Sequence, residues 1–231
     1  MSKRPGDDLM QVICVSHSDR PFFDVRSSIN FLEQRFEDGR LAKLPPFETL
    51  DGIDAAVPYN GALSIWGIMG EGNDELVALA SYAPDYKVQF ASFLDDRLIV
   101  LGADRIEILD PAFKVLKTIT DPWIAGGHTL YPVDQDNVWI TSAPANAALQ
   151  INLQTGEIVE RLRMPDECGS GYSLLPENDL RDHFIPTDFQ PTHLNSAVPD
   201  DDGLLTTFWI QGSVGRFDGN RDYREITSGF V

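Results

Sequence analysis

Short apolar runs separated by acidic or glycine-containing turns recur along most of this chain, and they restrict its fold more than any other feature. Clear examples are Leu98–Leu101, Arg105–Leu109, Val138–Thr141 and Leu204–Trp209. The runs are rich in β-branched and aromatic residues, and turn signals follow roughly every 8–12 residues. This pattern is typical of an all-β domain. The absence of long helical periodicity between the runs disfavours a parallel βαβ sheet.

A turn followed by a strand recurs as a unit at residues 60–65, 95–100, 134–140 and 200–205. The last two copies also share an upstream histidine and a later strand that ends in a turn. A repeat of roughly 40 residues with four strands is typical of propeller blades. One blade cannot bury both of its faces, so blades must stack around an axis. We expect an insertion over residues 164–192 to account for the longer last interval.

The segment Asn152-Leu153-Gln154-Thr155-Gly156-Glu157-Ile158 resembles the strand–Asp-x-x-Thr-Gly–strand turn of the quinoprotein-like and YVTN-like β-propellers. The acidic turn before each expected inner strand is similar to theirs as well. The resemblance covers roughly residues 53–231 and implies a propeller fold. Asn152 replaces the usual Asp, and fewer repeats are visible than the family usually has. Three arrangements stay open: a four-bladed ring, a partial propeller completed by a second copy, and part of a longer protein.

The regular alternation of apolar runs and turns begins near residue 53, so the first part of the chain has a different pattern. We predict a strand over residues 9–16 and a helix that begins at Ser27 or Ser28 and ends near Asp38. The predicted organisation is therefore an N-terminal tail, strand and helix over residues 1–52, followed by a propeller domain over residues 53–231. The fold class is an all-β, small or partial β-propeller of about four blade-like repeats.

The balance of charge is strongly acidic. The chain has 36 Asp and Glu against 18 Lys and Arg, which gives a net charge of −18 and a pI near 4.4. Such a surface repels nucleic-acid phosphates and anionic lipid headgroups, so we predict neither nucleic acid nor membrane as a partner. The acidity either keeps the protein in solution or attracts a basic partner or a cation. Without a secretory leader or an apolar stretch of ~20 residues, we predict a cytoplasmic protein.

Known cofactor and metal motifs are missing from the sequence. The two cysteines and four histidines are too scattered for a zinc site. The glycines at 67, 70 and 72 lack the Lys-Ser/Thr of a phosphate-binding loop. The acidic stretches 134–137 and 200–203 lack the EF-hand pattern and are interpreted as ordinary turns. We therefore predict no cofactor and no metal site.

Two histidines stand out because each precedes the acidic turn of its repeat. His128 and His193 occupy matching places in the third and fourth repeats, with Asn195 close to the second. Matching loops of adjacent blades meet at one mouth of a propeller channel, where histidines can bind a metal, move a proton or hold an anion. The alternative is that each histidine only hydrogen-bonds a neighbouring blade. The resemblance to propeller sulfotransferases and lyases, which use histidines at the channel mouth, implies catalytic roles for His128 and His193. Asn195 is the third catalytic candidate, because it lies close to His193 in sequence.

The candidate ligand-binding residues are Tyr172 and His183 in the insertion, and Trp209. Our leading hypothesis is a binding module that holds a small molecule or a protein partner at the channel mouth and the insertion loop. The first alternative is an enzyme, such as a lyase, cyclase or transferase, that uses the channel-mouth histidines. The second is a structural subunit of a larger assembly. A homodimer is the predicted partner arrangement if two copies complete one ring.

Overall fold

The computed structural model describes residues 10–17, 37, 61–69, 75–82, 86, 88–163, 179, 192–209 and 212–228. Within these residues the regular structure is β-strand, apart from Glu37, which is helical. The rest of the predicted helix, the predicted domain boundary after residue 52 and most of the predicted insertion lie outside the described residues. Helical structure of the length and apolar character needed to cross a membrane does not occur in the described part of the chain.

The strands form four antiparallel sheets, which we call blades 1 to 4. Blade 1 contains β1 (Met10–His17), β2 (Gly61–Met69) and β3 (Glu75–Tyr82). Blade 2 contains β4 (Val88–Leu94), β5 (Arg97–Gly102), β6 (Ile106–Leu109) and β7 (Val115–Ile119). Blade 3 contains β8 (Leu130–Pro132), β9 (Asn137–Ser142), β10 (Ala147–Asn152) and β11 (Ile158–Arg163). Blade 4 contains β12 (Leu194–Asp200), β13 (Gly203–Phe208), β14 (Ser213–Phe217) and β15 (Tyr223–Thr227).

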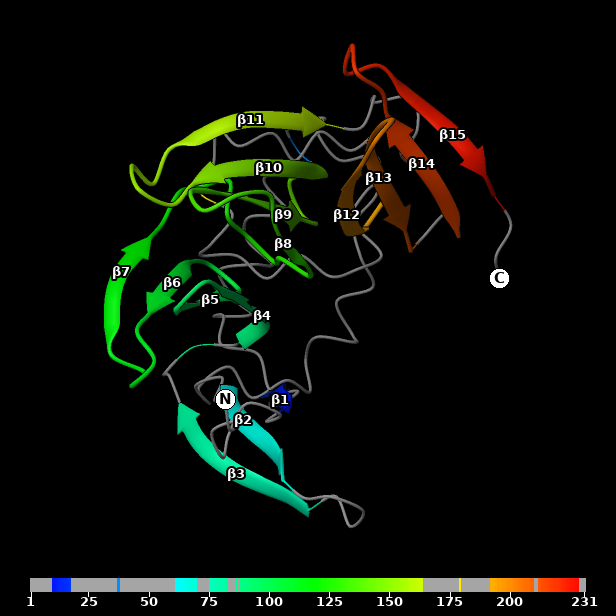
Figure 1. Cartoon of the computed structure of the whole chain (residues 1–231). Coiled ribbons are helices and arrows are strands. Elements are labelled where there is room, and N and C mark those ends of the chain that lie inside the picture. The colour runs from blue at the N-terminus through cyan, green and yellow to red at the C-terminus, as the bar shows by residue number, and fades with distance from the viewer. Residues whose placement is uncertain are drawn as a thin grey trace.

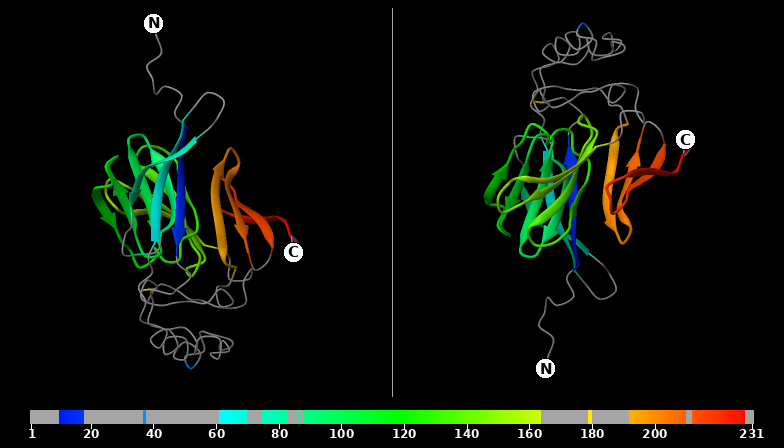
Figure 2. Two further views of the ribbon diagram at one scale, coloured as in Figure 1. Left: turned by 90° about the horizontal axis from the view of Figure 1, so that it is seen from below. Right: turned by 90° about the horizontal axis from the view of Figure 1, so that it is seen from above.

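The blades follow one another around an arc in chain order (Figure 1). The first strands of the blades lie on the inside of this arc, where β1 contacts β4, β4 contacts β8 and β8 contacts β12. Figure 2, which turns the molecule by 90°, shows the strands of neighbouring blades running along a common direction. Radially stacked antiparallel sheets with their first strands innermost define a β-propeller. The predicted all-β, partial-propeller fold is therefore confirmed.

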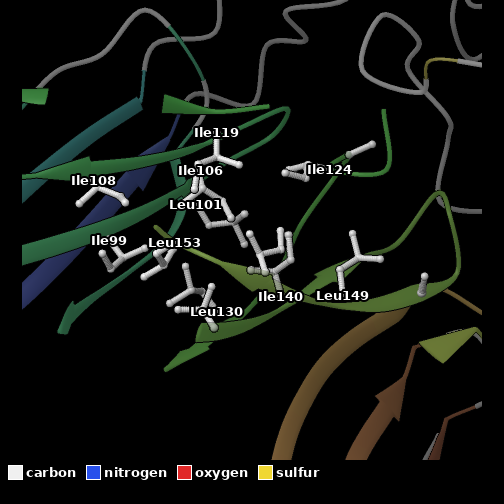
Figure 3. Packing of buried hydrophobic residues seen from close by; sticks show 14 of the residues in the cluster. Ile99, Leu101, Ile106, Ile108, Ile119, Ile124, Leu130, Ile140, Leu149 and Leu153 are labelled. Carbon is white, nitrogen blue, oxygen red and sulfur yellow. The ribbon is translucent and has the colours of Figure 1, made fainter. Parts of the chain in front are cut away.

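The core lies between the blades. Ile99, Leu101 and Ile106 of blade 2 pack against Ile140 and Leu149 of blade 3, as Figure 3 shows. A second cluster joins blade 3 to blade 4 and includes Trp139, Ala148, Leu162, Leu204, Phe208 and Phe217. Because blade 3 is covered on both faces, its strand β9 has buried residues at successive positions. This explains why the sequence shows continuous apolar runs where a half-exposed sheet would show strict alternation.

The N-terminal strand belongs to blade 1, because β1 pairs with β2 in register from Met10↔Ile68 to His17↔Gly61. One detail differs from the expectations. The acidic turns were expected to precede the innermost strands, whereas they precede the second strands β5, β9 and β13. Each acidic turn closes a hairpin between a first and a second strand, and this hairpin produces the repeat that the sequence shows.

Candidate functional site

Two imidazole rings meet where blades 3 and 4 adjoin. His128 lies in the segment that enters β8, and His193 immediately precedes β12. Their ring centroids are 4.7 Å apart and the rings are tilted by 51°. The structure therefore brings together the two histidines that the sequence singled out, at the end of the blades where the innermost strands begin. We call this place the mouth.

Strand β9 holds the His128 segment in position. The hydroxyl of Thr141 accepts hydrogen bonds from the backbone N–H of His128 at 2.9 Å and of Thr129 at 3.1 Å. The backbone N–H of Thr141 donates to the Thr129 carbonyl at 3.2 Å, which continues the β8–β9 ladder by one pair. Thr141 is completely buried, so these bonds are shielded from water. The entry into β8 is thereby fixed to the end of β9.

The turn that follows β9 holds the segment before β12. Thr192 donates a hydrogen bond from its hydroxyl to the side-chain oxygen of Asn146, and both residues are buried. Asn146 has φ 52°, a left-handed conformation that Asn tolerates better than most residues. One blade therefore anchors both histidine segments. Sequence reasoning did not single out Thr141, Asn146 or Thr192, because only the fold shows that these three small polar residues support the mouth.

The environment of His193 is unusual. His193 is only 7% exposed, and its Nδ1 atom has no hydrogen-bond partner. A buried polar group without a partner costs about 1–3 kcal/mol. Its backbone has φ 49°, which costs a non-glycine residue roughly 1–2 kcal/mol more. Unfavourable conformations of this kind concentrate at functional sites.

Burial also decides the charge of His193. It disfavours the imidazolium form and so lowers the pKa of His193 below the ordinary 6.5. The imidazole is consequently neutral at pH 7, and a neutral ring carries one nitrogen lone pair. The side-chain hydroxyl of Thr129, adjacent to His128, is a second buried polar atom without a hydrogen-bond partner.

Trp209 completes the mouth. It directly follows β13, and its backbone N–H donates to the His193 carbonyl at 3.1 Å. Its ring meets the His193 ring edge to face with centroids 6.4 Å apart. At 68% exposure, Trp209 presents much of its indole to solvent. Trp139, in contrast, is buried between blades 3 and 4.

The remaining predicted site residues are less informative. Asn195 lies on β12 at a β-bulge, where the pairing with β13 shifts between Leu194 and Ser196. When blades 3 and 4 are matched by strand register, His128 corresponds to Asn195, and His193 corresponds to a glycine at position 126. The sequence analysis predicted equivalent positions for the two histidines. The strand register shows that their positions are not equivalent. Tyr172 and His183 lie outside the described residues.

The acidic stretches form turns, as predicted. Asp134 accepts hydrogen bonds from the backbone N–H groups of Asp136 and Asn137, both at 2.8 Å. Asp200 accepts one from the backbone of Asp202 at 3.0 Å. Within the described residues, no group of three or more His, Cys, Asp or Glu side chains could hold a metal ion.

The side chain of Asn152 stabilises the turn between β10 and β11. Asn152 Oδ1 accepts hydrogen bonds from the backbone of Gln154 at 3.0 Å and of Thr155 at 2.8 Å. Gly156 has φ 84°, a conformation that favours glycine.

A cavity of about 450 Å³ lies between blades 3 and 4 at the end opposite the mouth. Trp139, Pro199 and Leu204 supply apolar lining, and the acidic turn 200–202 supplies carboxylates. The carboxylates of Asp200 and Asp202 already have a partner, because Arg216 pairs with both. An ion pair between Glu160 of blade 3 and Arg221 of blade 4 also borders the cavity. We interpret this end as a structural contact between the blades, in which the Glu160–Arg221 ion pair links blade 3 to blade 4.

The blades and their inner strands define a β-propeller scaffold. No known family model and no curated protein matches the chain. Among solved structures, it is similar to the WD40 domain of Pan2 from Neurospora crassa, with 11% identity over 74% of this chain and 46% of that one, and a TM-score of 0.45.

Two further solved structures are similar. Catalytically inactive virginiamycin B lyase from Staphylococcus aureus with quinupristin is 14% identical over 73% of this chain and 52% of that one, with a TM-score of 0.46. The WD40 propeller domain of Doa1 is 10% identical over 75% of this chain and 50% of that one, with a TM-score of 0.42. The chain therefore aligns with about half the length of each structure.

Proposed function

We propose that this chain is a propeller binding module that holds a small-molecule ligand at the mouth between blades 3 and 4. The observation that carries the proposal is the state of His193, a buried neutral imidazole whose Nδ1 has no partner. A polar atom buried in this way is stabilised when a ligand supplies the missing interaction. His128 and Trp209 flank it and provide a second imidazole and an exposed aromatic surface.

The arrangement suits recognition by a few placed polar groups beside an aromatic surface, as small-molecule sites commonly show. Trp209 offers apolar contact at little cost in side-chain entropy. The hydrogen bonds of Thr141 and Asn146 hold both histidine segments before any ligand arrives. Such preorganisation raises affinity because less order has to be gained on binding.

A fragment screen by ligand-observed NMR tests this proposal. We expect fragments that bind the wild-type chain to lose binding in Trp209→Ala, because this change removes the exposed aromatic surface without opening the core. Leu116→Ala is the matched control, since Leu116 is a 54% exposed apolar residue on the outer strand β7. Fragments that bind equally to wild type and Trp209→Ala overturn the proposal.

The wider hypotheses need their own measurements. A role for the predicted insertion in holding a ligand or protein partner is tested by deleting residues 170–188 and repeating the screen. Catalysis through His128 and His193 stays a prediction, as do a structural role in an assembly and a homodimer. Native mass spectrometry of the purified chain separates these alternatives, because it reports bound small molecules and oligomeric state together.

A further inference from the structure

We propose that His128 and His193 together bind one divalent transition-metal ion of the zinc, nickel or copper kind at the mouth. This inference deepens the proposed function, because it names the chemical class of ligand for the same site. The two residues come from different blades, so the ion would also connect blade 3 to blade 4.

The geometry of the two rings favours this assignment. Metal–imidazole bonds are about 2.0–2.1 Å long, so two imidazoles on one ion have ring centroids roughly 4.5 Å apart for a right-angle arrangement and 5.2 Å for a tetrahedral one. The observed separation of the His128 and His193 centroids is 4.7 Å, between these values. Backbone hydrogen bonds already hold the segment that carries His128.

The chemistry of the groups agrees with the geometry. A metal binds the neutral form of imidazole through a nitrogen lone pair. Imidazole nitrogen prefers zinc, copper and nickel, whereas magnesium and calcium prefer oxygen ligands. An ion at Nδ1 of His193 would also satisfy the buried atom that has no hydrogen-bond partner.

The proposed site has two protein ligands among the described residues, so its other coordination positions are open. Open positions are characteristic of sites where a metal meets an exchangeable ligand. Trp209 lies beside His193 and would border that side of the ion. A small molecule with a metal-binding group and an apolar part would then satisfy both features of the mouth.

The test is a titration of the full chain, treated with a chelator and dialysed, with zinc chloride or nickel chloride and with magnesium chloride as a control. We expect one zinc or nickel ion per chain and no binding of magnesium. His193→Asn and His128→Gln should each weaken binding at least about tenfold, since loss of even an indirect metal contact has effects of that size. Asn is chosen at 193 because it tolerates the left-handed backbone there.

His17→Gln is the matched control, because His17 lies at the end of β1 in blade 1. Thermal melts without metal establish that each variant folds. A second measurement needs no variant: in an NMR spectrum of the imidazole nitrogens, zinc should shift His128 and His193 and leave His17 unchanged.

Absence of zinc and nickel binding overturns the inference. Wild-type affinity in either mouth variant, or a loss of affinity in His17→Gln, also overturns it. The fragment screen on Trp209→Ala is independent of metal. If no ion binds but the fragments still require Trp209, only the metal inference fails and the proposed function stands.

Discussion

The buried hydroxyl of Thr141 accepts hydrogen bonds from two consecutive backbone N–H groups, those of His128 at 2.9 Å and Thr129 at 3.1 Å. This small side chain at the end of β9 thus determines where the His128 segment enters blade 3. The same blade holds the neighbouring segment through the bond between Thr192 and Asn146. The geometry of the mouth therefore depends on the buried polar side chains of Thr141, Asn146 and Thr192.

Replacing Thr141 with Val should destabilise the protein by about 1–3 kcal/mol, because two backbone N–H groups lose their acceptor while the volume stays the same. Thr141→Ser keeps the hydroxyl and should recover most of the loss. Urea denaturation of the three proteins measures the difference. Equal stability of wild type and Thr141→Val would mean that water replaces the hydroxyl and that the segment is not fixed by it.

Asn146→Gly isolates the second anchor. Glycine accepts the φ of 52° without strain, so the change removes only the side chain that accepts from the buried Thr192 hydroxyl. We expect a loss of about 1–3 kcal/mol, offset in part by the relaxed backbone. Adding Thr192→Val to Asn146→Gly should recover stability, because the double variant leaves no buried hydroxyl without a partner. A double-mutant cycle in chemical denaturation shows whether the two changes are coupled.

Gly203 should be intolerant of a side chain. It has φ 141°, and a Cβ atom added there would overlap the Phe217 carbonyl oxygen in the hairpin partner β14. We expect Gly203→Ala to lose more than about 3 kcal/mol, since both the backbone and the packing oppose it. Gly219→Ala is the control, because nothing lies within 4 Å of its added Cβ. Thermal melts of the two variants should differ clearly, and similar melting temperatures contradict the packing described for this hairpin.

Asp134 should make a small pH-dependent contribution to stability. The Asn137 side chain and the Asp136 backbone N–H donate to its carboxylate and lower the pKa of Asp134 below the usual 3.8. The native state therefore binds the proton less readily than the unfolded chain does. The stabilisation is present above pH 3.8 and is lost as the pH falls through the lower native pKa.

Asp134→Asn keeps an acceptor oxygen in the turn and removes the charge. We expect the variant to melt slightly below wild type near pH 7 and the difference to shrink as the pH falls below 3.8. Melting curves at several pH values measure this. A constant difference across that range contradicts a charge effect and indicates a purely geometric role for the carboxylate.

The all-β class and the strand positions could be predicted from the sequence because they are local properties. The runs around Ile99, Ile140 and Leu204 have continuous apolar character and sit between turn-forming residues, so each specifies a strand. The strand over residues 9–16 was found in the same way. Local pattern did not reveal that β1 joins β2, because strand pairing across a long separation leaves no periodic signal in either segment.

At the mouth, too, some features could be predicted from the sequence and others could not. The upstream position of His128 and His193 relative to their turns was enough to predict that they meet at one end of the propeller. It also led to the wrong expectation that the two residues are equivalent, because a bulge and a register offset between blades are invisible in the sequence. The support from Thr141 and Asn146 was missed because small polar residues occur at many strand ends and in many turns.

By itself, the sequence determined the acidic charge, the strands and the hairpin turns, since these follow from side-chain chemistry and spacing along the chain. The tertiary structure alone decided that His193 is buried and neutral, that its Nδ1 lacks a partner and that His128 lies 4.7 Å away. Desolvation and contact between residues depend on the packing of one blade against the next. Those quantities exist only once blades 3 and 4 have come together.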